Sequence, residues 1–141
     1  MRRQISLEFI GIILFSLIIF IVGASLIARS ALNDATDHNL DHYIEIIEIE
    51  ANQSLDYPTL VDKYESIDDY LRITIIDPDG VVLADSLAED LDNHINRPEI
   101  RNIGDAYIRQ SDTLNIEMMY KAVLLESGDY LRIAIPTASI L

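Results

Sequence analysis

The sequence contains no cysteine and no tryptophan, and only five glycines and four prolines among its 141 residues. A chain without cysteine forms no disulfide, no thiolate metal site and no thiol nucleophile, so its stability must come from burial. Basic residues are also few, because ten of them oppose 24 acidic residues, for a formal net charge of −14. Negative charge of this size repels nucleic acid and attracts cations. We therefore expect no nucleic-acid partner.

Residue types that carry catalysis are sparse as well. The chain has three histidines, and the spacing brings together no Ser-His-Asp set and no pair of carboxylates suited to acid–base work. We therefore expect that this segment is not an enzyme and that it needs no cofactor.

One long apolar run stands out against these absences. The twenty residues from Phe9 to Ala28, FIGIILFSLIIFIVGASLIA, carry no charge, and as a helix they cross a hydrocarbon core of about 30 Å. Arg2 and Arg3 precede the run and an acidic segment follows Arg29, which places residues 1–8 in the cytoplasm and the rest outside. The sequence predicts a transmembrane helix at 9–28 that contacts membrane lipid, with the domain facing outside the cytoplasm.

A cleaved signal peptide is the alternative reading of this run. The apolar region of a signal peptide is normally roughly 7–15 residues long and is followed by an A-x-A-like cleavage site. The run here is longer, and its small residues near Ala24 and Ala28 do not have that arrangement. A retained anchor in the cell membrane therefore fits better.

Residues 29–136 are enough for one domain with one hydrophobic core. Neither proline nor glycine interrupts residues 30–54, so we expect the membrane helix to continue into this domain as one long helix. Four apolar residues recur at helical spacing on one face, and we expect this face to serve dimerisation and transmission. They are Leu40, Ile44, Ile47 and Ala51.

A second apolar strip, formed by Tyr43, Ile46 and Ile49, follows another side of the same helix. It indicates a helix covered on two sides, by a sheet and by a partner helix.

The rest of the domain has the patterns of short strands, one short helix and a loop. Alternation and turn residues predict strands at 71–76, 81–86, 107–111, 114–125 and 130–135, and a helix at 57–66. Residues 87–104 are expected to form a loop with a helical turn at 97–100. The turn Asp77-Pro78-Asp79-Gly80 joins the first two strands. The expected fold class is α+β, with the long helix packed on a roughly five-stranded antiparallel, PAS-like sheet. We expect residues 137–141 to begin a second transmembrane segment.

The strand at 114–125 has the clearest alternation in the chain. Its even-numbered residues, among them Met118, Tyr120 and Ala122, are apolar, whereas the other face contains Glu117, Met119 and Lys121. The pattern predicts a core on the even face and a largely hydrated odd face.

Four motifs together resemble the extracytoplasmic sensor region of PhoR-type membrane histidine kinases, whose input module has a PAS-like or single-Cache-like fold. They are IIDPDGVVLADS (75–86), NHINRPEI (93–100), IRQSDT (108–113) and GDYLRIAIP (128–136). With the membrane anchor they span nearly the whole chain in the order of the family.

The resemblance implies the signal-sensing part of a two-component system. In that family a dimeric sensor controls a cytoplasmic autokinase, which passes its phosphate to a response regulator. No stretch of this chain resembles a phosphoacceptor helix or a nucleotide-binding box, so ATP and magnesium would belong only to a kinase part that is absent here. The stimulus, a small molecule or a protein, is not indicated.

Several side chains are suited to bind a small anion, because guanidinium forks and hydroxyls match carboxylate or phosphate oxygens. The resemblance to Cache-type sensors implies that a ligand would lie between the outer face of the sheet and residues 87–104. The alternative is that these arginines pair with the abundant carboxylates and hold the loop on the sheet. The candidates are His94, Arg97, Arg109, Ser111, Tyr120 and Arg132.

A metal site is a further candidate. His38 and His42 lie four residues apart on the predicted helix, a spacing that lets two imidazoles hold zinc or another divalent cation. The spacing fixes no third ligand, so a hydrated membrane-proximal stalk explains the pair better. Asp77 and Asp79 resemble the start of a calcium loop, but no glutamate follows at the right offset, and a hairpin turn explains them.

Two other functions compete with kinase sensing. The chain would otherwise be a membrane-anchored binding or assembly module without kinase output, or a divalent-cation sensor. For the latter, the acidic excess resembles that of magnesium-responsive sensors in which cations bridge the domain to the membrane, although solubility alone also explains it.

Overall fold

The computed structural model describes residues 2–54, 56–67, 70–87 and 92–137. The chain divides into two compact units, residues 1–34 and 35–141. Of the second membrane segment predicted at 137–141, all residues but Thr137 lie outside the described residues.

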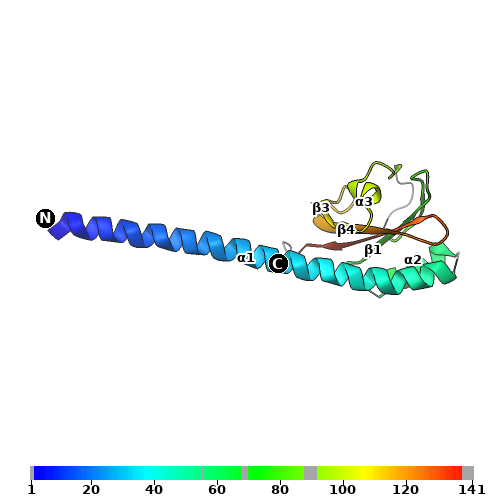
Figure 1. Ribbon diagram of the computed structural model, residues 1–141, viewed down its shortest axis with the longest axis horizontal. Coiled ribbons are helices and arrows are strands. Elements are labelled where there is room, and N and C mark those ends of the chain that lie inside the picture. Colours follow the sequence, from blue (N-terminus) through cyan, green and yellow to red (C-terminus); the bar gives the residue numbers. More distant parts are fainter. Residues whose placement is uncertain (1, 55, 68–69, 88–91, 138–141) are drawn as a thin grey trace. The chain divides into compact units, whose positions relative to one another are not determined.

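The first unit consists of the first part of helix α1, Arg2–Gln53 (Figure 1). Every residue from Phe9 to Val22 is exposed, and the most apolar stretch of the helix has no buried residue. By length and composition this stretch could cross a membrane as a span, and an N-terminal signal sequence has the same properties. The prediction of one unbroken helix from the apolar run to about residue 54 is confirmed.

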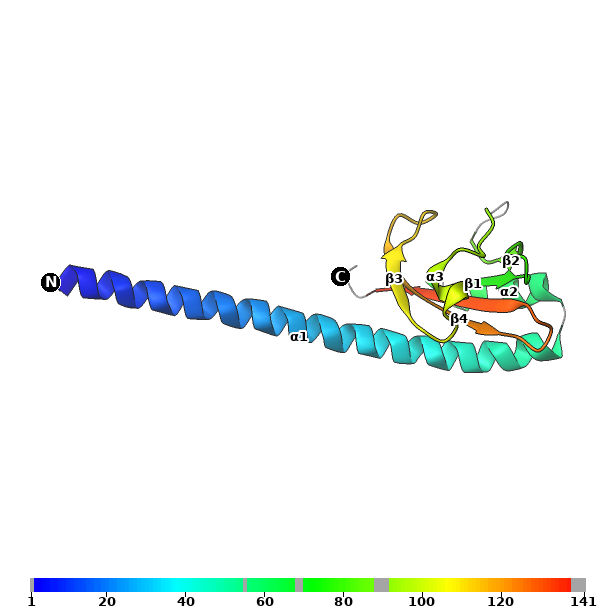
Figure 2. The ribbon, with the colours of Figure 1, turned by 45° about the horizontal axis from the view of Figure 1, so that its top comes forward.

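The second unit is an α+β domain built on one antiparallel sheet. The strands are β1 (Arg72–Ile76), β2 (Val82–Asp85), β3 (Tyr107–Gln110), β4 (Glu117–Leu124) and β5 (Tyr130–Pro136), in the spatial order β2-β1-β5-β4-β3. The sequence-distant β1 and β5 pair at the centre, with Thr74 opposite Arg132. In Figure 2, β2 and β3 lie at opposite ends of the sheet.

The main core lies between one face of the sheet and two helices, the second half of α1 and α2 (Tyr57–Glu65), as Figure 1 shows. Asp56 caps α2 by accepting a hydrogen bond from the Thr59 amide at 3.3 Å, and Pro58 stands in its first turn. From the sheet, Ile73 and Ile133 enter this core.

The apolar face of α1 is part of this core. Leu40, Ile44, Ile47 and Ala51 are at most 6% exposed and pack in one cluster with residues of β1 and β5. The sheet of the same chain therefore covers the face on which we expected a second copy to pack. The four residues therefore have little surface left for a second copy, and their part in dimerisation and transmission stays a prediction, whereas Ile46 and Ile49 are exposed.

The central strands are covered on both faces. In β4 all five residues from Met118 to Ala122 are buried, so the prediction of a hydrated face carrying Met119 and Lys121 is wrong. Met119 joins the core under α1, while Tyr120 faces the other side. Strand β4 also begins three residues later than expected, because the Ser111–Asn115 segment turns, with Asn115 at φ 54°.

The second face of the sheet is covered by the connection between β2 and β3, which contains the short helix α3 (Pro98–Arg101). Gly80, in the β1–β2 turn, holds this connection close. Its φ of 88° lies in the left-handed region that favours glycine. Its carbonyl accepts a hydrogen bond from the His94 amide at 2.7 Å, which brings the two backbones close together. A Cβ at Gly80 would collide with Asn93 and Ile95.

Candidate functional site

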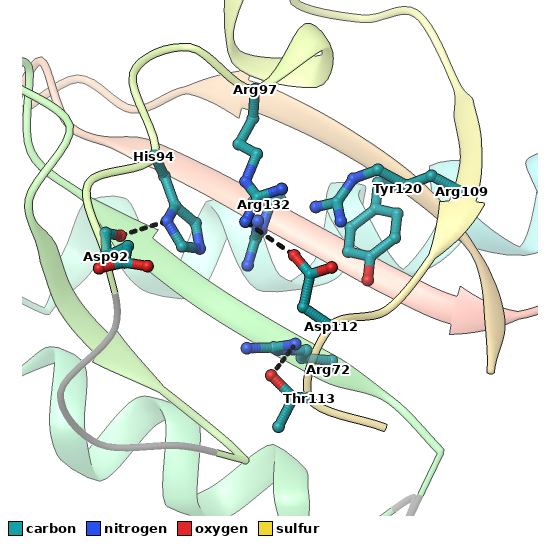
Figure 3. A pocket seen from close by; sticks show the side chains of 9 residues that line it. All are labelled: Arg72, Asp92, His94, Arg97, Arg109, Asp112, Thr113, Tyr120 and Arg132. Carbon is teal, nitrogen blue, oxygen red and sulfur yellow. Dashed lines mark hydrogen bonds and ion pairs between the residues drawn. The ribbon is translucent and has the colours of Figure 1, made fainter. Parts of the chain in front are cut away.

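A small polar pocket of about 100 Å³ lies on the face of the sheet opposite α1 (Figure 3). The strands β1, β4 and β5 form its floor, and the α3 connection and the β3–β4 turn form its walls. It is lined by Arg72, Asp92, His94, Arg97, Arg109, Asp112, Thr113, Tyr120 and Arg132.

Two buried arginines form the floor. Alternation along the strands turns Arg72 and Arg132 toward the pocket, while their neighbours Ile73 and Ile133 enter the core under α1. Arg72 Nε donates to Asp85 Oδ2 at 3.1 Å, and Arg132 Nη2 donates to Thr74 Oγ1 at 2.9 Å. Burial, opposed by the charge of Glu99, lowers the pKa of Arg132 to about 10, so its guanidinium stays charged at neutral pH.

Glu99 is the buried carboxylate on which two arginines converge. Its Oε1 accepts hydrogen bonds from Arg109 Nη2 at 3.1 Å and from Arg132 Nη1 at 3.4 Å. The short helix α3 places it there, fully buried. Among the described residues, Oε2 of Glu99 and the Nε atoms of Arg109 and Arg132 have no hydrogen-bond partner. The network is therefore incompletely satisfied.

An aromatic ring supports the cations. The guanidinium carbon of Arg109 lies 3.9 Å from the ring centroid of Tyr120, and that of Arg132 lies 5.4 Å from it. Stacking of this kind orients a guanidinium without neutralising it, because the ring carries no net charge. Arg109 thus keeps its charge directed toward the pocket.

His94 closes one side of the pocket. Its side chain is 3% exposed, and its Nδ1 contacts the carbonyl oxygen of Asp92. Burial and the positive charge of Arg132 lower the pKa of His94, with smaller contributions from Arg97 and Arg72. At neutral pH the imidazole is therefore uncharged and can serve as a hydrogen-bond donor or acceptor.

The rim of the pocket consists of an ion pair between two turns. Arg97 Nη2 lies 3.1 Å from Asp112 Oδ2, and these side chains are 33% and 75% exposed. Thr113, next to Asp112, accepts a hydrogen bond from Arg72 Nη1 at 3.3 Å. The β3–β4 turn is thus bound to the α3 connection through Asp112 and to the floor of the pocket through Thr113.

The structure brings together five of the six residues that the sequence suggested for anion binding. His94, Arg97, Arg109, Tyr120 and Arg132 all line the pocket. Ser111 does not; it is buried and its hydroxyl accepts a hydrogen bond from the Leu114 amide at 3.2 Å, which stabilises the β3–β4 turn. Whether the five residues bind a ligand stays a prediction.

Sequence reasoning missed Arg72. The signal was a charged residue at the start of an otherwise apolar strand, RITII. An arginine in a strand with both faces buried needs an anionic partner or a ligand. Its position beside Arg132 depends on the pairing of β1 with β5, which local spacing does not reveal.

The metal site predicted at His38 and His42 lacks further ligands. Both histidines are exposed on α1, and the described part of the chain holds no group of three His, Asp or Glu residues arranged for a metal ion. The neighbouring acids Asp37 and Asp41 bind Lys121 Nζ instead, at 3.0 and 2.5 Å. The predicted site is therefore not formed in these residues.

Lys121 joins the pocket strand to α1. It follows Tyr120 in β4, so the two adjacent side chains lie on opposite faces of the sheet, one in the pocket and one under α1. The Lys121 side chain is 10% exposed and pairs with two acids one helical turn apart. The carboxylates raise its pKa against the opposing effect of burial.

No family model matches the chain, and no curated protein or solved structure matches it either.

Proposed function

We propose that this chain is the membrane-anchored sensing region of a two-component sensor histidine kinase, with a PAS-like domain outside the cytoplasm. The observation that carries the proposal is helix α1, which contains both the apolar run and one wall of the domain core. A shift of α1 under the sheet would also displace the apolar run, because both belong to the same helix.

The placement of the pocket supports this proposal. Its residues lie on the sheet face opposite α1, and each central strand contributes neighbouring side chains to the two faces. A ligand that binds better to one arrangement of the α3 connection would shift the equilibrium of the strands beneath it. Lys121 would pass that shift to Asp37 and Asp41 on α1.

The proposal includes a homodimer that uses the exposed strip of α1. Ile46 and Ile49 are 45% and 57% exposed, and Asn39 and His42 extend the strip at alternating spacings of three and four residues. This spacing is typical of a helix that packs on a parallel partner. Beside it lies a groove of about 440 Å³ that Tyr43 and Tyr70 also line.

Disulfide crosslinking tests this arrangement directly, because the chain has no cysteine of its own. Single substitutions Ile46→Cys and Ile49→Cys are made in the full chain in membranes, with Glu48→Cys as a half-buried control on another side of α1. We expect oxidation to give crosslinked dimers at the two isoleucine positions and far fewer at Glu48. Equal crosslinking at all three positions would contradict the dimer.

The kinase output has a separate test, the coding sequence downstream of Leu141. A second apolar span followed by a phosphoacceptor helix and a nucleotide-binding domain would support the proposal. An immediate stop codon would favour a membrane-anchored binding module.

A further inference from the structure

The carboxylate of Asp112 is an exposed charged group at the rim of the pocket. It lies on the β3–β4 turn with 75% of its side chain exposed, and within the described part of the chain it forms an ion pair with Arg97. An exposed pair of this kind has a small net stability, because water solvates both partners well when they separate. In Figure 3 the Asp112 carboxylate points into the space between Arg97, Arg109 and Arg72.

The charges around the pocket balance only while Asp112 is in place. Four arginines, at positions 72, 97, 109 and 132, face four carboxylates, those of Asp85, Asp92, Glu99 and Asp112. His94 adds no charge at neutral pH, because its pKa is lowered. When the β3–β4 turn moves away, one positive charge in the pocket has no counter-ion.

Some N–H donors of the guanidinium groups make no hydrogen bond to any residue that the structure describes. The Nε atoms of Arg109 and Arg132 are buried without a hydrogen-bond partner among the described residues. Arg97 makes one 3.1 Å contact to Asp112 with a single nitrogen, although a guanidinium fork can bind a carboxylate or phosphate through two. Unused guanidinium donors are suited to bind a free oxyanion once Asp112 has moved away.

We propose that the pocket binds a small oxyanion carrying a carboxylate or phosphate group, and that Asp112 is a tethered competitor that occupies its mouth when the anion is absent. The anion replaces the Asp112 carboxylate at Arg97, and the β3–β4 turn swings outward. This inference rests on the proposed sensory function for its purpose, since the displaced turn would be the first movement of the signal. A pocket of about 100 Å³ admits an anion of a few heavy atoms.

Isothermal titration calorimetry on the full chain in non-ionic detergent tests the proposal. The probes are sodium acetate, sodium succinate and sodium phosphate, titrated at constant ionic strength against a sodium chloride reference. Asp112→Asn removes the competing charge, and Asp62→Asn removes one exposed charge from α2, on the other side of the sheet. Arg97→Gln removes the guanidinium for which the Asp112 carboxylate and the probe anion would compete.

We expect at least one probe to bind the wild-type chain. Asp112→Asn should bind it about threefold more tightly, the factor expected when a weak surface ion pair no longer competes. Asp62→Asn should leave the affinity unchanged, and Arg97→Gln should weaken binding by about tenfold, because a charge-assisted hydrogen bond is lost. Binding of the carboxylates alone, or of phosphate alone, supports the proposal and identifies the chemical group.

Two results would overturn it. One is that neither the wild-type chain nor Asp112→Asn binds any probe at millimolar concentration. The other is that Asp112→Asn binds no more tightly than Asp62→Asn. Melting curves confirm that each variant is folded, and Asp112→Ala repeats the test if the asparagine variant is not. Crosslinking of α1 is measured without any anion, so it tests the proposed dimer independently of anion binding. The dimer can be disproved while anion binding is confirmed, and anion binding can be disproved while the dimer is confirmed.

Discussion

Arg72, Arg132 and Glu99 are charged side chains that are at most 4% exposed, in a domain without disulfides. A buried ion pair is a weak source of stability, because desolvation offsets most of the attraction between the charges. Removal of one partner is nevertheless costly, since it leaves the other charge buried alone. These residues therefore constrain the pocket more than they stabilise the fold.

At the same scale, His94 gives the domain a pH dependence. Its lowered pKa means that the unfolded chain binds a proton more readily than the folded chain does. The stability that His94 contributes is therefore present above the unfolded pKa of about 6.5 and is lost as the pH falls through the folded pKa. We expect the free energy of unfolding to lose at most about 1.4 kcal/mol per pH unit from this group.

The measurement compares urea unfolding of the wild-type chain and His94→Gln between about pH 7.5 and pH 5.5. The wild type should lose stability relative to the variant as the pH falls. His38→Gln, which removes an exposed histidine of α1, controls for a generic effect of losing one imidazole. Parallel pH profiles for the wild type and His94→Gln would show that burial of His94 has no such effect.

Local sequence predicted some of the pocket residues and missed others. Residue chemistry identified Arg97, Arg109 and Arg132, because guanidinium groups match the oxygens of carboxylate and phosphate anions. Arg72 and Ser111 were misjudged for a common reason. The role of each depends on a hydrogen-bond partner or a strand neighbour that is distant in the sequence or lies across a turn.

Among the elements, strand β4 separates the two faces of the sheet most sharply. The sequence predicted its period of two correctly, and the sites of the hairpin turns and of α2 as well. It did not predict that both faces are buried, because a period-two pattern does not say what covers each face. Lys121 looks like a solvated residue in the sequence and is in fact held under α1 by two acids.

Replacement of Lys121 by methionine tests this contact. The Lys121→Met variant should lose about 1 kcal/mol of stability, because two charge-assisted hydrogen bonds are removed while the aliphatic part is retained. Amide hydrogen exchange should become faster at residues 36–41, where the bound acids lie. Denaturant unfolding and exchange mass spectrometry provide the two measurements.

Lys63→Met is the matched control for this variant. Lys63 also pairs with a carboxylate of α1, Glu50, at 2.6 Å, but its side chain is 51% exposed. An exposed pair contributes little, so Lys63→Met should change the stability less than Lys121→Met does. Equal effects of the two substitutions would argue against a special role for the buried lysine.

For the whole molecule, the order of elements was sufficient to predict an α+β class and a five-stranded antiparallel sheet. The long helix followed from the absence of proline and glycine over residues 30–54. The relation to PhoR-type sensors stays a prediction, since it depends on short motifs that many turns and strands share.

The apolar run of α1, which could be a membrane span or a signal sequence, is tested by membrane extraction. The wild-type chain, expressed in cells, should stay in the membrane fraction after alkaline extraction, with an intact N-terminus by mass spectrometry. The double variant Leu17→Arg/Ile18→Arg should be extracted, because each arginine at the centre of a span costs about 2.5–3.5 kcal/mol of insertion free energy. A mature chain that starts near residue 25 or 29 would instead show a cleaved signal peptide.

The ion pair between Arg97 and Asp112 joins residues that are fifteen positions apart in one chain. A group attached in this way acts at an effective concentration on the order of millimolar. A free anion that binds Arg97 as well as Asp112 does must exceed that concentration to displace it. An anion that fits the pocket better displaces Asp112 at a proportionally lower concentration. The β3–β4 turn would then set a detection threshold, and changes in its length or charge would retune the threshold without altering the buried floor of the pocket.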